Sequence, residues 1–262
     1  MPKVITERRG RTFIVTINRQ EARNAVDADT ANLLNDAVNL FRQDDDLRVM
    51  LLTGAGDVSF CAGADLKGAL GLAENRNAQE DGPMGFSRIT DVQKPSIAAI
   101  EGYCLAGGLE LACWCDFRIA AAHSRFGVVN RRWGVPLIDG GTQRLWRIVG
   151  LGNALYLIET GAMISADHAL RMGLVQEIVP KGKALERSLE LAEAISNYPW
   201  NSLVRDRQAV YEGLAMTLPE GLRHEKLLHV ASLRDKEMLD GLDRFIRGQR
   251  PQPPTPPSSS CC

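Results

Sequence analysis

The chain has no long hydrophobic run. No stretch of about 18 consecutive apolar residues occurs, so we expect no membrane-spanning helix and no membrane partner. The opening residues, MPKVITERRG, lack the apolar segment of a signal peptide, which predicts a cytoplasmic protein. Lysine plus arginine (31) nearly balance aspartate plus glutamate (32), so no basic field is present to attract nucleic acid.

Metal-ligand spacings are also missing. The four histidines and six cysteines do not combine into the patterns that zinc sites use, and we therefore expect no metal. Four of the cysteines, at 61, 104, 113 and 115, lie in apolar stretches, which predicts reduced thiols in the core. Cys261 and Cys262 end a tail rich in proline and serine.

Several nucleotide and nucleophile motifs are absent. Thr53-Gly54-Ala55-Gly56 starts like a dinucleotide-binding turn, but its third glycine would fall at Ser59, so an ordinary loop is the preferred interpretation. The sequence also has no P-loop and no Gly-x-Ser-x-Gly elbow.

The pattern that is present is a buried strand, a glycine-rich turn and a helix, found twice. Apolar runs at 49–53 and 96–100 predict the strands, and the turns follow at 54–64 and 102–108. A helix is expected over 109–114 and a returning strand over 117–120. This alternation favours an α/β fold.

The remaining elements follow from periodicity and from cap residues. Val4–Thr6 and Phe13–Ile17 predict an opening hairpin, and Asp29 is the expected cap of a helix through Phe41. Residues 68–92 are expected to be a mobile loop with a helix near 86–92. Further helices are expected at 144–149, 153–159, 166–172, 184–196, 202–212, 218–239 and 242–246, with a strand at 175–179.

Three regions result from these patterns. Residues 1–197 would form the core, residues 198–248 a helical region for oligomerisation, and residues 249–262 a disordered tail rich in proline and serine. The helices after Ser202 have an apolar face with little core left to cover.

The glycine-rich turns can do chemistry, because glycine permits backbone angles that point several amides at one oxygen. Two such turns that converge would make an oxyanion hole for a thioester enolate. Taken singly, each turn is better explained as a tight connection between a strand and a helix.

Ordered motifs at 18–19, 23–25, 60–67, 94–103, 106–111, 115–116, 140–145 and 161–175 resemble those of the enoyl-CoA hydratase/isomerase (crotonase) superfamily. The resemblance covers about residues 3–248. It implies a crotonase-like spiral of ββα turns followed by a C-terminal helical trimerisation region, and a homotrimer or hexamer. It also implies an acyl-CoA thioester as the substrate, with no separate cofactor.

The resemblance assigns roles to particular residues. The amides of Ala64 and Gly107 would hold the thioester oxygen, and Glu110 would be a catalytic acid/base. Five residues would bind the CoA moiety: Arg23, Ala25, Ala62, Asp65 and Leu66.

Glu110 has a rationale of its own. It lies one turn into an otherwise apolar helix, so burial should raise its pKa towards acid/base duty. A glutamate that binds amides at the helix start is an equally good explanation from the residues alone.

The pattern breaks at Asn130, which stands where hydratases of the family carry a second glutamate. An amide cannot exchange a proton at neutral pH. Asp139 and Asp65 are the other carboxylates that could compensate, although Asp65 is better explained as a support for its turn. Arg131, Arg132 and Trp133 are expected to pack on the surface or at a subunit contact.

The leading hypothesis is therefore an enoyl-CoA hydratase-like lyase in which Glu110 is the acid/base and Asn130 orients water. Another enolate reaction at the same site, such as isomerisation, decarboxylation or thioester hydrolysis, is the first alternative. A non-catalytic acyl-CoA-binding protein is the second.

Overall fold

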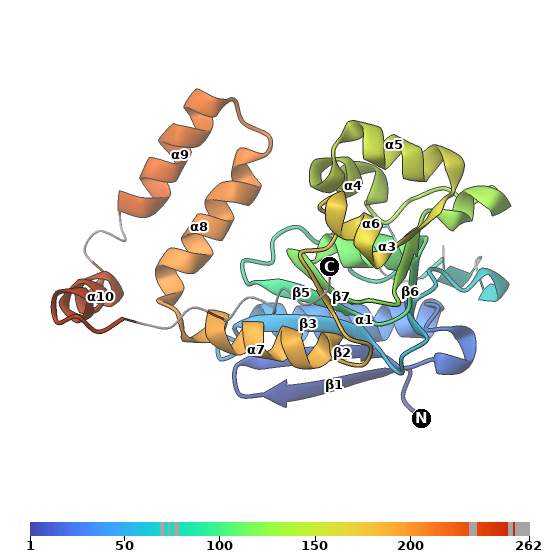
Figure 1. Cartoon of the computed structure of the whole chain (residues 1–262), viewed down its shortest axis with the longest axis horizontal. Coiled ribbons are helices and arrows are strands. Elements are labelled where there is room, and N and C mark those ends of the chain that lie inside the picture. Colours follow the sequence, from blue (N-terminus) through green and yellow to red (C-terminus); the bar gives the residue numbers. More distant parts are fainter. Residues whose placement is uncertain (69–70, 73, 76–78, 231–234, 251–253, 255–262) are drawn as a thin grey trace.

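The computed structural model describes residues 1–68, 71–72, 74–75, 79–230, 235–250 and 254 (Figure 1). The strands are β1 (Val4–Arg9), β2 (Thr12–Ile17), β3 (Val49–Gly54), β4 (Ser59–Cys61), β5 (Ser96–Ile100), β6 (Tyr103–Leu105), β7 (Phe117–Ala121), β8 (Arg125–Gly127), β9 (Met163–Ser165) and β10 (Glu177–Val179).

The helices are α1 (Ala28–Gln43), α3 (Gly107–Trp114), α4 (Gly141–Val149), α5 (Leu151–Thr160), α6 (Ala166–Arg171), α7 (Ala184–Asn197), α8 (Trp200–Gly213), α9 (Leu218–Val230) and α10 (Lys236–Ile246). Short 3-10 helices are η1 (Gln20–Ala22), η2 (Leu66–Gly68) and η3 (Val129–Trp133).

The chain winds between two sheets. One sheet has the strand order β1-β2-β3-β5-β7-β10, and the other has the order β4-β6-β8-β9. Each of β3, β5 and β7 lies in the first sheet and leads into β4, β6 or β8 of the second. Neighbours within this series pair in parallel, so successive units stack as turns of a spiral. The predicted α/β spiral is confirmed.

The apolar run at β3 shows why the strands lack polar alternation. Met50 and Leu52 face the core between the two sheets, whereas Val49 and Leu51 face a second core under α7. Both faces of the strand are covered, as in other parallel sheets, so its first four positions are all apolar. The predicted opening hairpin is also confirmed, with β1 antiparallel to β2.

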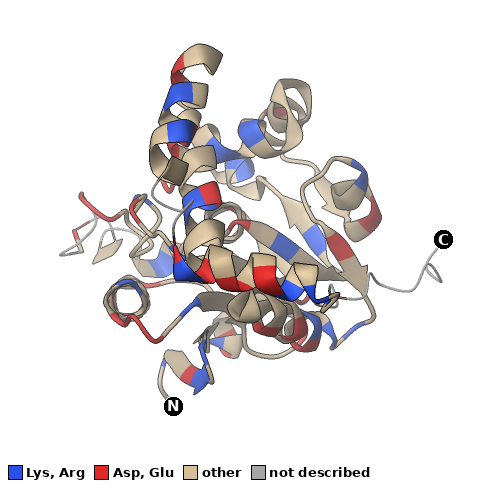
Figure 2. Cartoon of the chain, turned by 90° about the vertical axis from the view of Figure 1, so that its left-hand side faces the viewer, with Lys and Arg blue, Asp and Glu red and all other residues tan. Residues whose placement is uncertain are grey.

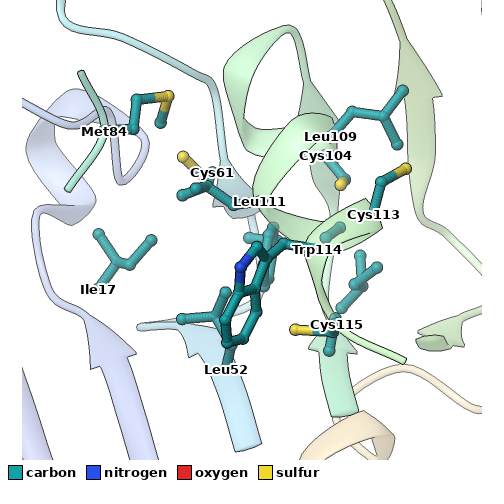
Figure 3. Packing of buried hydrophobic residues seen from close by; sticks show 14 of the residues in the cluster. Ile17, Leu52, Cys61, Met84, Cys104, Leu109, Leu111, Cys113, Trp114 and Cys115 are labelled. Atoms are coloured by element: carbon teal, nitrogen blue, oxygen red, sulfur yellow. The ribbon is translucent and has the colours of Figure 1, made fainter. Parts of the chain in front are cut away.

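The core cysteines lie where the sequence predicted. Figure 3 shows Cys61, Cys104, Cys113 and Cys115 packed near Leu111 and Trp114. All four are buried and free, and burial raises the pKa of the Cys61 thiol to about 12. These groups therefore act as small apolar side chains rather than as nucleophiles.

Helices α8 and α9 stand away from the two sheets as an antiparallel pair, with α10 beyond them (Figure 1). None of these three helices contains a buried residue. Arg207 of α8 binds Asp116, which follows α3. Its guanidinium donates to both carboxylate oxygens of Asp116 at 2.8 Å. The Tyr211 hydroxyl donates to the same carboxylate at 2.6 Å.

Three predicted details were wrong. The cap of α1 is Asp27, not Asp29: its carboxylate accepts the Thr30 amide at 2.9 Å, whereas Asp29 lies in the first turn and binds Lys3. The helix expected near 86–92 is a series of turns and irregular backbone. Side chains bind the backbone there instead, for example the Trp114 indole, which donates to the Ile89 carbonyl at 2.8 Å.

The third concerns the single helix expected over 218–239. Asp235, which precedes α10, has an extended backbone (φ -68, ψ 142) that no continuous helix can contain, so α9 and α10 are separate helices. Parts of the loop expected at 68–92 and most of the expected disordered tail, including Cys261 and Cys262, lie outside the described residues.

Charged side chains of both signs are interspersed on the side of the molecule that Figure 2 presents. In the described ranges, no helix combines the length and the apolar character of a membrane span.

Candidate active site

Two glycine-containing turns meet at the N-terminus of α3. A Cβ placed on Gly63 would lie 2.9 Å from the Gly107 nitrogen, and a Cβ placed on Gly107 would lie 3.5 Å from the Ala64 nitrogen. Gly63 has a φ of +102°, which a residue with a side chain rarely adopts. The turns that follow β4 and β6 therefore bring the Ala64 and Gly107 amides side by side.

The Ala64 and Gly107 amides are free to donate hydrogen bonds to a ligand. Other amides of the Ala64 turn already have acceptors in the protein: the Ala62 amide donates to the Arg23 carbonyl at 3.1 Å, and the Asp65 amide donates to the Val26 carbonyl at 2.8 Å. Among the described residues, no acceptor is recorded for the Ala64 or the Gly107 amide. The Gly107 amide also lies in the first turn of α3, where the helix dipole favours negative charge.

The backbone at this point is strained. Ala106, which precedes Gly107, has φ 50 and ψ -126, a conformation outside the usual regions for a residue with a side chain. Such a conformation costs on the order of 1–3 kcal/mol and persists only where the surroundings enforce it. Here it turns the chain from β6 into α3 so that the Gly107 amide faces the Ala64 turn.

Met84 packs against Gly107. Its sulfur lies 2.3 Å from the position that a Cβ on Gly107 would occupy, and the side chain is fully buried. The thioether belongs to a flexible side chain, so it can shift at little cost to admit a bound group.

Glu110 lies one turn further along α3 and is only 4% exposed. Its Oε1 accepts the Asp139 amide at 3.0 Å and the Gly141 amide at 2.8 Å. Burial raises the pKa of Glu110 to about 7; the Gly141 amide opposes this shift, and the nearby charge of Asp139 adds to it. The carboxyl can thus both accept and donate a proton near neutral pH.

Glycine is required at position 141. A Cβ there would lie 2.8 Å from Cγ and 2.9 Å from Oε1 of Glu110. The glycines of the 140–141 turn therefore let the start of α4 approach the carboxyl closely.

A cavity of about 10 Å³ adjoins Glu110, roughly room for one water molecule. Its lining is otherwise apolar: Ala106, Leu109, Cys113, Val128, Leu137, Gly141 and Leu145. A larger groove of about 1140 Å³ begins at Cys113 and Leu137, which line both spaces, and extends towards α8.

Asn130 is buried in η3, with 7% of its surface exposed. Its Nδ2 donates to the Val135 carbonyl at 2.8 Å, but its buried Oδ1 has no partner among the described residues. No hydrogen bond in the described part of the chain joins Asn130 to Glu110. An unpartnered buried carbonyl oxygen costs free energy unless a water or a ligand donates to it.

The residues predicted to bind CoA lie together. The Ala62 amide binds the Arg23 carbonyl, and Arg19 donates to the Ala25 carbonyl at 2.6 Å and to the Asp65 carboxylate at 3.0 Å. Leu66 begins η2 beside Asp65 and is half exposed.

The sequence analysis missed what holds this cluster in place. Arg19 crosslinks it, and the buried Asn24 side chain donates to the Ala55 and Ser59 carbonyls at 3.0 and 2.6 Å. Both residues belonged to the recognised 18–25 motif, but only the fold shows their partners. Met84 had no sequence signal, because it lies in an irregular segment.

Arg131 and Arg132 bind α5 rather than the site. They donate to the Ile158 and Gly161 carbonyls at 3.3 and 2.8 Å, which satisfies free carbonyl groups at the end of that helix. Trp133 is 74% exposed. Arg131, Arg132 and Trp133 therefore lie at the surface, as the sequence predicted.

Comparisons with known proteins agree with this geometry. The family model described as enoyl-CoA hydratase/isomerase matches residues 7–252. The chain belongs to this family. It is 34% identical to a short-chain-enoyl-CoA hydratase of Clostridium acetobutylicum, over 94% of this chain and 95% of the relative.

Other relatives have similar names. A crotonyl-CoA hydratase of Syntrophomonas wolfei is 34% identical over 94% of this chain and 96% of its own length. The crystal structure of enoyl-CoA hydratase EchA1 from Mycobacterium marinum superposes with a TM-score of 0.89 at 32% identity, covering 96% of this chain and 98% of that one. The crotonase fold expected from the motifs is thus confirmed.

Proposed function

We propose that this member of the enoyl-CoA hydratase/isomerase family adds water to the double bond of a 2-enoyl-CoA. The observation that carries the proposal is the pair of unoccupied amides at Ala64 and Gly107, one helical turn from a buried carboxyl whose pKa is near 7. The names of the relatives, enoyl-CoA and crotonyl-CoA hydratases, support the same reaction.

The two amides act on the thioester oxygen. As water attacks Cβ, electrons move from the double bond to the thioester, and negative charge develops on that oxygen. Donors already in place stabilise this charge without reorganising, and each is worth about 10²–10³ in kcat.

Glu110 exchanges a proton during the addition. At its pKa of about 7, it can take a proton from water or give one to Cα. The cavity beside it has room for roughly one water molecule.

The CoA moiety would bind at the cluster of Arg23, Ala25, Ala62, Asp65 and Leu66, which begins next to the Ala64 amide. Arg23 supplies a cation for the CoA phosphates, and its guanidinium lies 5.7 Å from the centre of the Tyr103 ring. CoA is part of the substrate here, so the reaction needs no separate cofactor.

The direct test follows the loss of ultraviolet absorbance by the enoyl thioester of crotonyl-CoA and of longer 2-enoyl-CoAs. Turnover supports hydration. Binding of CoA esters without turnover of any ester would instead favour the non-catalytic alternative, and turnover of other acyl-CoAs without hydration would favour an isomerase, decarboxylase or thioester hydrolase.

Asn130 is proposed to orient the attacking water through its unpartnered Oδ1. We expect Asn130→Ala to lower kcat for hydration by about 10-fold, the equivalent of one hydrogen bond. Steady-state kinetics on crotonyl-CoA would measure this, with circular dichroism to confirm folding. A folded variant with unchanged kcat would remove Asn130 from the mechanism.

We also propose a homotrimer or a hexamer in the cytoplasm. Residues on α8–α10 such as Val210, Leu218, Leu227, Phe245 and Ile246 are 62–81% exposed, which is unusual for large apolar side chains unless a partner covers them. Light scattering on the full chain should give three or six times its mass of 28.7 kDa. A stable monomer would contradict the assignment.

A further inference from the structure

A second carboxyl lies beside Glu110. Asp139 is 3% exposed and immediately precedes the Gly140–Gly141 turn. The Glu110 carboxylate accepts the backbone amide of Asp139 at 3.0 Å, so the Glu110 side chain reaches the turn that carries Asp139. The sequence placed Asp139 in the neighbourhood but could not show that it is buried or that its amide binds Glu110.

The surroundings of Asp139 hold its carboxyl in one orientation. Its Oδ1 accepts the Met84 amide at 3.1 Å and also the Ser87 hydroxyl. For Oδ2, no hydrogen bond is recorded in the part of the chain that the structure describes. One oxygen is thus fixed, and the other remains able to carry or to accept a proton.

Asp139 is also linked to Gly107 through Met84. Met84, whose backbone binds the Asp139 carboxylate, places its sulfur against Gly107. Contacts thus connect the Ala64 turn, the start of α3 with Gly107 and Glu110, and the Asp139 turn, which are three separate parts of the chain.

Burial raises the pKa of Asp139, and the Ser87 hydroxyl, the Met84 amide and the positive charges of Arg88 and Arg144 oppose this shift. The Asp139 charge in turn raises the pKa of Glu110. Like charges on two buried carboxyls disfavour the state in which both are ionised, so one of them retains a proton more readily.

We propose that Asp139 is the second proton-transfer group of the site and supplies what Asn130 cannot. This inference rests on the proposed hydration. One carboxylate of the pair takes a proton from water as the water oxygen bonds to Cβ. The other, protonated carboxyl gives its proton to Cα as the enolate collapses, so one water molecule is added and the pair again holds one proton.

The competing explanation is that Asp139 only anchors the 82–88 segment through its two hydrogen bonds. Asp139→Asn separates the two explanations, since an amide oxygen can still accept from Met84 and Ser87 but the group no longer transfers a proton. Ser87→Ala is the matched variant, because it weakens the anchor and leaves the carboxyl in place.

For proton transfer, we expect Asp139→Asn to lower kcat for crotonyl-CoA hydration by at least about 10²-fold with little change in KM, and to remove one limb of the pH profile of kcat. Ser87→Ala should lose less than about 10-fold and keep both limbs. Circular dichroism confirms that both variants fold.

An Asp139→Asn enzyme with nearly wild-type kcat, or with a loss no larger than that of Ser87→Ala and an unchanged pH profile, would overturn the inference. These outcomes are distinct from failure of the proposed function. If the wild-type protein hydrated no 2-enoyl-CoA, the proposed function itself would be wrong and the inference would fall with it.

Discussion

Glu110→Gln is expected to lower kcat for 2-enoyl-CoA hydration by at least about 10²-fold, the usual contribution of a general acid/base. The substitution is isosteric, and the glutamine oxygen can still accept the amides of Asp139 and Gly141. The geometry of the site is therefore kept while the transferable proton is lost. Binding of CoA esters, measured by calorimetry, should change little.

The same variant should be more stable than the wild type at alkaline pH. The pKa of Glu110 is about 7 in the folded protein against an ordinary value of 4.5, so the folded state binds the proton more tightly than the unfolded state. Stability of the wild type therefore falls as pH rises from 4.5 to 7, and the full cost, about 3 kcal/mol, is present above pH 7. Glutamine carries no charge and avoids this cost.

Thermal unfolding of both proteins at pH 4 and pH 8 checks the linkage. Glu110→Gln should raise Tm at pH 8 and change it little at pH 4, where the wild-type carboxyl is mostly protonated in both states. Glu159→Gln, on an exposed position of α5, is the control and should alter neither kcat nor Tm. Unchanged kcat in folded Glu110→Gln would end the proposed role of this residue.

Gly107→Ala is expected to lower kcat by about 10²–10³-fold, because the new methyl group would crowd the oxygen bound by the paired amides. Its Cβ would lie 3.5 Å from the Ala64 nitrogen, an ordinary contact, and 2.3 Å from the Met84 sulfur. The sulfur belongs to a flexible side chain and can move, and Gly107 has no positive φ, so the fold should survive. The defect should therefore appear in catalysis rather than in stability.

Gly152→Ala provides the control for this variant. Gly152 lies in α5, and a Cβ there would meet no atom within 4 Å. Kinetics on crotonyl-CoA and thermal unfolding should show wild-type behaviour. Wild-type kcat in a folded Gly107→Ala protein would contradict the proposed oxyanion site.

Some elements were predictable because their causes are local. The run at β3 is apolar at nearly every position, and this pattern alone predicts a buried strand. The cap of α1 was placed two residues too late, since Asp27 and Asp29 are both suitable and only the contact with Thr30 decides between them. The turns at 86–92 were unpredictable because they depend on distant side chains: the Trp114 indole of α3 binds the Ile89 carbonyl, and the Asp139 carboxylate accepts the Ser87 hydroxyl.

The sequence by itself determined the α/β spiral, the family and the candidates Glu110, Ala64 and Gly107. Apolar strand patterns, turn glycines and motif order are all local features of the sequence. Only the tertiary structure decided that the Ala64 and Gly107 amides are adjacent and unoccupied, that Met84 packs against Gly107, and that Glu110 binds the Asp139 amide. These are contacts between residues 23 to 55 positions apart. Such contacts depend on how the two sheets stack, and no local periodicity encodes that stacking.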